Sequence, residues 1–239
     1  MLGYSKKRRA FKLMKNRDVC FFIGLCLTIM MVMGIGGPGS VSAMDQEKTI
    51  QLPKPVSTGK LSLEETLLRR ESARDFTSQP LTPHEISQLL WAAQGVTRKW
   101  GGRTAPSAGA LYPLETYLVT AEGSFHYLPA RHQMSRLSDR NLLKDLCLAA
   151  LGQACTREAP SVIVLTAVYE RTAGKYGPRA ERYIAMEAGH AAQNILLQAT
   201  ALGLGAVPVG AFHDDRVQKA LGLPVDHRPL YLIPVGHRR

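Results

Sequence analysis

Hydrophobic residues recur along most of the chain with the spacings of helices and strands. Ile86, Leu89, Leu90 and Ala93 lie three or four positions apart, which places them on one face of a helix over 84–95. Further helices are predicted over 63–70, about 139–152, about 179–203 and 214–222. Strands are predicted over 114–121, 124–130, 161–169 and 229–236. Because the two kinds of element do not alternate strictly, the pattern indicates an α+β fold.

Local signals support several of these elements. Ser62 with Glu65, and Thr82 with Pro83 and Glu85, have the spacing of helix caps. A turn at 122–123 predicts a hairpin between the first two strands. The unbroken apolar run over 161–169 is typical of a strand buried on both faces. The long Ala- and Gly-rich helix over 179–203 predicts cover on most sides, from the core or from a partner subunit.

The first 43 residues predict an export signal. They carry seven Lys or Arg against one Asp, followed by an apolar segment over 19–33 and a small-residue cleavage site at 41–43. A linker is then expected over 44–60, and one domain over 61–239. Arg8 and Arg9 resemble a twin-arginine signal, a start at Met14 leaves an ordinary secretory signal, and an uncleaved membrane anchor is the alternative to cleavage. The mature protein is therefore expected in the periplasm or secreted, with this segment as its one membrane contact.

Charge and motifs exclude several classes of function. Of the net charge of +11, the residues after 43 contribute +5 without a basic run, so no nucleic-acid partner is expected. The scattered His residues lack metal-binding spacings, and no metal site is expected. Cys147 and Cys155 fall in one apolar helical stretch, about 12 Å apart along its axis. That separation is too large for a disulfide, and both are expected in the core.

Three short segments are candidates for chemistry. The loop over 101–113 is irregular yet apolar, which suits a backbone that lies against a flat group. Arg69, Arg70, Ser72 and Arg74 suit a phosphate, or form an exposed basic helix end. Arg238 and Arg239 could bind the same anion or be a solvated tail. Lys175 and Tyr176 could handle a proton, or be an ordinary surface pair.

Six segments, in order, resemble a known family. They are RRESARDF, LLWAAQG, RTAPSAGALYPLETYLV, KYGPRAERYIAMEAGHAAQNILLQATALGLG, PVGAF and PLYLIPVG. Over about residues 61–236 the chain resembles the FMN-dependent nitroreductases, and within them the SagB-type dehydrogenases, which include azoline dehydrogenases that make thiazoles and oxazoles. The resemblance implies a central, mostly antiparallel sheet flanked by helices, FMN as cofactor, and a homodimer with flavin at the subunit interface.

The resemblance also implies roles for particular residues. The family's phosphate motif corresponds to Arg70, Ser72 and Arg74, joined by Arg238 after the last strand. The segments that meet the flavin ring correspond to Pro106, Ser107, Ala108 and Gly109, and to Pro208, Val209 and Gly210. The catalytic pair of azoline dehydrogenases corresponds to Lys175 and Tyr176. Two positions depart from the pattern: Glu71 lies inside the phosphate motif, and Ala180 follows Arg179 where the subgroup often has Gly.

The implied activity is hydride transfer between a small-molecule or peptide substrate and flavin N5, with Lys175 and Tyr176 assisting proton removal. One alternative is an NAD(P)H-dependent nitroreductase or quinone reductase. The export signal disfavours it, because nicotinamide coenzymes are scarce outside the cytoplasm. The other alternative is a flavin-binding domain without turnover. Azoline dehydrogenases normally work beside a cyclodehydratase on a cytoplasmic peptide, and an exported chain departs from that setting, so the substrate stays open.

Overall fold

The computed structural model describes residues 49–239, and the predicted export signal lies outside the described residues. These residues build a seven-stranded sheet in the order β1-β4-β3-β2-β5-β7-β6. All neighbouring strands in it are antiparallel. The strands are β1 (Thr49–Gln51), β2 (Leu114–Thr120), β3 (Gly123–Leu128), β4 (Gln133–Ser138), β5 (Ser161–Val168), β6 (Leu204–Ala206) and β7 (His227–His237).

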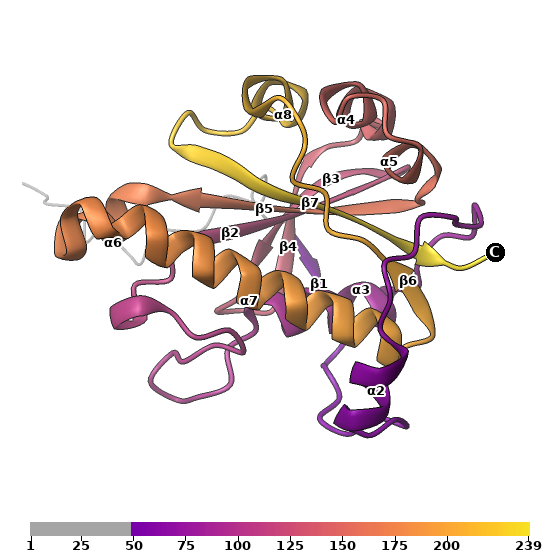
Figure 1. Cartoon of the computed structure of the whole chain (residues 1–239), viewed down its shortest axis with the longest axis horizontal. Coiled ribbons are helices and arrows are strands. Elements are labelled where there is room, and N and C mark those ends of the chain that lie inside the picture. Colours follow the sequence, from indigo (N-terminus) through magenta and orange to yellow (C-terminus); the bar gives the residue numbers. More distant parts are fainter. Residues whose placement is uncertain (1–48) are drawn as a thin grey trace, which may run out of the picture. The chain divides into compact units, whose positions relative to one another are not determined.

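Helices cover both faces of this sheet (Figure 1). On one side lie α3 (Pro83–Gln94) and α7 (Ala180–Ala201), with α2 (Leu63–Arg69) and α6 (Tyr169–Tyr176) at the ends of α7; on the other lie α4 (Leu143–Ala149), α5 (Ala154–Glu158) and α8 (Asp214–Leu221). Strand β5 is buried throughout, with Ile163 and Leu165 in one core and Val162 and Val164 in the other. This confirms the α+β fold with an antiparallel sheet flanked by helices.

The helix caps and the hairpin that the sequence predicts are present at the predicted positions. Thr82 and Glu85 form the reciprocal capping box of α3, and the Ser62 side chain accepts a hydrogen bond from the Glu65 N–H at the start of α2. Strands β2 and β3 form the predicted hairpin. Within residues 49–239 no helix is both long enough and apolar enough to span a bilayer.

Three predictions about elements are wrong. The expected linker over 44–60 contributes a strand, because β1 pairs with β4 and adds an edge to the sheet. The expected helix over 139–152 is shorter and ends at Ala149, since Leu151 and Gly152 adopt positive φ and the Gly152 N–H closes on the Cys147 carbonyl at 2.9 Å; the separate helix α5 follows this turn. Cys147 and Cys155 therefore lie on different helices, although both are buried and free.

Candidate functional site

The predicted phosphate motif leaves the end of α2 as an extended segment. Ser72 pairs with Ala206, next to β7, and the Ala73 N–H donates to the Ala206 carbonyl at 3.1 Å. Side chains alternate along extended backbone, so Arg70, Ser72 and Arg74 share one side. Within residues 49–239 neither Arg70 nor Arg74 has a carboxylate partner. This segment therefore offers two guanidinium groups that can bind an anion.

Arg238 lies beside this motif, but its charge is paired. The Arg238 guanidinium forms an ion pair with Glu71, and the backbone of Arg238 pairs with that of Phe76. The packing is tight here, because a Cβ at Gly205 would lie 2.6 Å from the Ala73 Cβ. Glu71, the residue that departs from the family pattern, thus faces a cation. Arg238 adjoins the motif without adding a free charge to it.

The predicted Pro208–Gly210 turn follows strand β6, to which Ala206 belongs. Val209 exchanges two backbone hydrogen bonds with Leu232, at 2.8 and 3.0 Å. Gly210 is exposed and Pro208 is partly buried. Because Ala206 pairs with Ser72, this turn belongs to the same part of the protomer as the motif. We call the group comprising Arg70, Ser72, Arg74, Pro208–Gly210 and Arg238 the arginine end.

The predicted loop and the predicted Lys-Tyr pair meet elsewhere. Residues 108–110 form a short 3₁₀ turn in which Gly109 has φ +63°. A Cβ at Gly109 would lie 2.9 Å from the Tyr176 hydroxyl and 3.0 Å from Lys175 Nζ, so the close approach as well as φ requires glycine. Lys175 and Tyr176 end helix α6. We call the group comprising Pro106, Ser107, Ala108, Gly109, Lys175 and Tyr176 the loop end.

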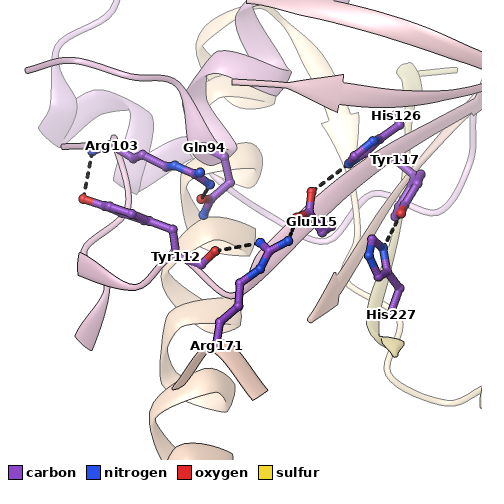
Figure 2. Close-up of polar contacts among 8 residues, drawn as sticks. All are labelled: Gln94, Arg103, Tyr112, Glu115, Tyr117, His126, Arg171 and His227. Carbon is purple, nitrogen blue, oxygen red and sulfur yellow. Dashed lines mark hydrogen bonds and ion pairs between the residues drawn. The ribbon is translucent and has the colours of Figure 1, made fainter. Parts of the chain in front are cut away.

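A polar network anchors helix α6 to the sheet and to the loop (Figure 2). Arg171 binds Glu115 with Nη2 and Oε1 2.5 Å apart, and its Nη1 donates to the Tyr112 carbonyl at 3.2 Å. The other Glu115 oxygen lies 2.7 Å from His126 Nε2. Burial acts to raise the pKa of Glu115, but the His126 hydrogen bond and the Arg171 charge outweigh it and lower that pKa. Glu115 is therefore ionised, and it fixes the first turn of the helix that carries Tyr176.

A second set of contacts holds the loop itself. Arg103 Nη1 donates to Gln94 Oε1 at 2.8 Å, and its guanidinium lies 4.5 Å from the centre of the Tyr112 ring. The Tyr112 N–H donates to Ser107 Oγ at 2.9 Å. The sequence reasoning did not identify the contacts of Arg171, because this residue lies more than fifty positions along the chain from both Glu115 and Tyr112. The available signal is Glu115, which is the one charged residue of strand β2.

Beside the loop lies a cavity of about 240 Å³, lined by Pro106, Ser107, Ala108, Tyr183, Met186, Glu187 and His190. Glu187, 3% exposed, contributes a carboxyl group to it. Burial raises the pKa of Glu187 to about 7, against opposing effects of Ser107 and Arg103. The cavity thus combines apolar walls with a group that titrates near neutral pH.

Helix α7 separates the two ends (Figure 1). Glu187 lines the cavity at the loop end, whereas Thr200 lines a pocket with Arg69, Glu71 and Arg238 at the arginine end. Glu187 and Thr200 are thirteen positions apart along the helix, which corresponds to about 20 Å. The structure therefore collects the predicted site residues into two groups and does not join those groups within one chain.

An antiparallel sheet with helices on both faces carries the arginine end at one end of α7 and the loop end at the other, which defines an α+β domain with two groups of candidate site residues. The Nitroreductase family model matches residues 67–237, and the chain belongs to this family. A curated Methanocaldococcus jannaschii protein named as a nitroreductase is 44% identical over 201 residues, covering 82% of this chain and 99% of that protein. The chain is therefore an oxidoreductase of a flavin-dependent enzyme family.

Two further comparisons agree. The NADPH-flavin oxidoreductase of Vibrio harveyi is 26% identical over 182 residues, which cover 72% of this chain and 64% of that protein. A nitroreductase structure from Ralstonia eutropha superposes with a TM-score of 0.72 at 29% identity, covering 87% of this chain and 97% of that one. Both support the family and the fold.

Proposed function

We propose that this protein is an FMN-dependent dehydrogenase of the SagB type, acting on a small molecule or peptide. The observation that carries the proposal is the approach of Lys175 and Tyr176 to Gly109, where a single added carbon would touch both side chains. The sequence separates this pair from the loop by more than sixty positions. If Lys175 and Tyr176 were an ordinary surface pair, their approach to the glycine turn of the apolar loop would not be expected.

The residues of the arginine end fit a phosphate, and those of the loop end fit a flat ring. Arg70 and Arg74 present guanidinium groups without a carboxylate partner in residues 49–239, with the exposed Ser72 hydroxyl between them. Pro106, Ala108 and Gly109 offer an apolar, small-residue surface. When bound, FMN supplies the group that accepts or gives a hydride.

The division of the site supports a homodimer. Each flavin would be gripped by the arginine end of one copy and covered by the loop end of the other. Several large apolar side chains are exposed in a single copy: Leu63 (61%), Leu67 (52%) and Leu68 (85%) of α2, Trp100 (71%) directly before the loop, and Met186 (54%) of α7. Patches of this kind mark contact surfaces, and a second copy would cover them while completing both sites.

Within such a site Tyr176 would exchange a proton with the substrate, because its hydroxyl lies at the glycine turn. Lys175, whose Nζ lies 5.4 Å from the centre of the Tyr176 ring, would place a positive charge beside that proton transfer. Arg171 acts one turn earlier in the same helix by fixing its orientation. The proposed export of the mature domain would place this chemistry outside the cytoplasm.

An NADPH-dependent flavin reductase is the second candidate. The similarity to the Vibrio harveyi NADPH-flavin oxidoreductase favours it. The two candidates share the cofactor and differ in the electron donor. Lys175 and Tyr176 are needed by the dehydrogenase, whereas a reductase that receives hydride from NADPH does not require them.

The test begins with the absorption spectrum of the purified protein, followed by acid release and chromatographic identification of the chromophore. We expect FMN, about one per subunit. The loaded protein is then mixed anaerobically with NADPH or with a synthetic thiazoline peptide. Reduction by the peptide supports the dehydrogenase and reduction by NADPH supports the reductase. A protein that takes up no added FMN contradicts both.

A further inference from the structure

A buried carboxyl group lies beside the apolar loop, and the proposed chemistry of Lys175 and Tyr176 leaves it without a role. Glu187 occupies the middle of α7, is almost wholly buried, and lines the cavity formed with Pro106, Ser107 and Ala108. A buried carboxylate needs a cation or several hydrogen-bond donors, whereas a neutral carboxylic acid needs fewer. The surroundings of Glu187 therefore decide its charge.

These surroundings give the charged form little support. Within residues 49–239, Glu187 Oε1 has no hydrogen-bond partner and the carboxyl group has no cation within ion-pair distance. The Ser107 hydroxyl and the more distant Arg103 charge favour ionisation, but burial outweighs them and raises the pKa of Glu187 to about 7. Small changes in hydration will therefore change its protonation near neutral pH.

The other titratable and charged groups near this carboxyl group come from several elements. Tyr183 and His190 share its helix and line the same cavity. The Tyr176 ring lies 5.0 Å from that of Tyr183, which brings α6 to the edge of the cavity. Among the described residues these groups are Arg103 and Ser107 from the loop, Tyr183 and His190 from α7, and Lys175 and Tyr176 from α6, with Glu115, Tyr112 and Arg171 acting through Arg103.

We propose that Glu187 takes up a proton when a flat ligand with an apolar face fills the cavity beside Ser107, so that ligand binding at this site is coupled to protonation. The proposal rests on the proposed function, in which the FMN ring lies along Pro106–Gly109. A ring placed there excludes water from the carboxyl group, which penalises the carboxylate more than the acid. The proton comes from solvent, and the acid that forms can donate a hydrogen bond within the site.

Calorimetry measures this coupling directly. FMN is titrated into FMN-free full-length protein at pH 8, where Glu187 is mostly ionised, in buffers that differ in ionisation enthalpy. We expect the wild type to take up a substantial fraction of one proton per subunit. Its affinity for FMN should fall several-fold from pH 7.5 to 9, within a limit of about tenfold per pH unit for one proton. The FMN phosphate titrates near pH 6 and contributes little in this range.

Matched variants test whether Glu187 is the group that takes up the proton. Glu187→Gln has the shape of the neutral acid, so it should take up no proton and bind FMN with little dependence on pH. Glu181→Gln, at the exposed start of α7, and His190→Gln should both keep the uptake. Uptake that persists in Glu187→Gln, or that disappears in His190→Gln, overturns the proposal.

Infrared spectroscopy provides a second readout that needs no ligand. In FMN-free protein, a carboxylic-acid C=O band should titrate with a midpoint near pH 7 and should be absent from Glu187→Gln. Wild-type protein that binds FMN without proton uptake overturns this inference alone. Wild-type protein that binds no FMN overturns the proposed function with it.

Discussion

The arginine end and the loop end of helix α7 are built in opposite ways. At the arginine end, Arg70 and Arg74 come from one short extended segment and lack carboxylate partners within residues 49–239. At the loop end, the side chains converge from separate segments and are fixed by polar contacts that Arg171 makes with Glu115 and Tyr112. Exposed, unpaired cations suit reversible binding of a charged group. A turn held by several polar contacts suits the accurate placement of a reacting group.

This difference predicts that substitutions at the arginine end and at the loop end impair different properties of the protein. Damage to the arginine end should remove the cofactor and leave the fold intact, because its side chains support little else. Damage to the loop end should slow chemistry or alter stability while the phosphate stays anchored. Four predictions test this division, beginning with the largest effect.

The double substitution Arg70→Ala with Arg74→Ala should weaken FMN binding by about 100-fold or more, since each charge-assisted hydrogen bond contributes about 1.5–3 kcal/mol. Fluorescence titration of FMN-free protein measures the effect. Arg69→Ala is the matched control, because Arg69 pairs with Glu65 on the helix surface and should leave the affinity nearly unchanged. Equal FMN affinity in wild type and double variant would move the phosphate site elsewhere.

Tyr176→Phe should slow substrate-dependent reduction of the bound flavin by roughly 100-fold, the usual scale for loss of a general acid or base. FMN affinity should not change, because Tyr176 belongs to the loop end. Anaerobic stopped-flow absorption measures the rate. Tyr169→Phe, at the other end of α6, serves as the control and should react like the wild type. An unchanged rate in Tyr176→Phe removes this residue from the mechanism.

Glu115→Gln should destabilise the domain by about 1–3 kcal/mol at pH 7, because it leaves Arg171 without its carboxylate. The folded-state pKa of Glu115 lies below its ordinary value of 4.5, so its contribution is complete above that value and is lost as pH falls through the folded pKa. Denaturant unfolding should therefore show the difference from wild type shrinking in acid. A difference that stays constant down to pH 3 contradicts this account of Glu115.

Glu187→Gln should show the opposite pH dependence, with an amplitude of at most about 3 kcal/mol. The folded-state pKa of Glu187 is raised to about 7, so its contribution is complete below about pH 4.5 and is lost as pH rises through 7. The variant should accordingly gain stability relative to wild type between pH 5 and 8. Parallel unfolding curves for the two proteins across that range would show that Glu187 is not held neutral.

Much of the fold could be predicted from the sequence, because local signals dominate it. The alternating cores of β5 and the caps of α2 and α3 follow from residue spacing alone. The break at Leu151 was missed because a non-glycine residue in the left-handed region leaves no pattern. Strand β4 was missed because QMSRLS is largely polar, and only pairing with β1 and β3 makes it a strand.

The candidate site shows the same difference between residues that local sequence patterns indicate and residues that only long-range contacts bring together. The predicted phosphate motif is local, and its residues 69–74 suit a phosphate or an exposed basic helix end on spacing alone. The bracing of the loop by Glu115 and Arg171, and the burial of Glu187, depend on contacts between segments far apart in sequence. The proximity of Lys175 and Tyr176 to Gly109 could not have been derived from spacing, and the family resemblance implied only a separate role for each group.

The central claim is that one flavin site draws its arginine end from one copy and its loop end from another. Complementation tests it: the Arg70→Ala, Arg74→Ala chain and the Tyr176→Phe chain are each inactive alone, and are then co-expressed and purified together. A shared site leaves each mixed dimer one fully intact site, so the mixture should recover roughly a quarter of wild-type flavin reduction. A mixture as inactive as its two components would show that both ends act within a single copy.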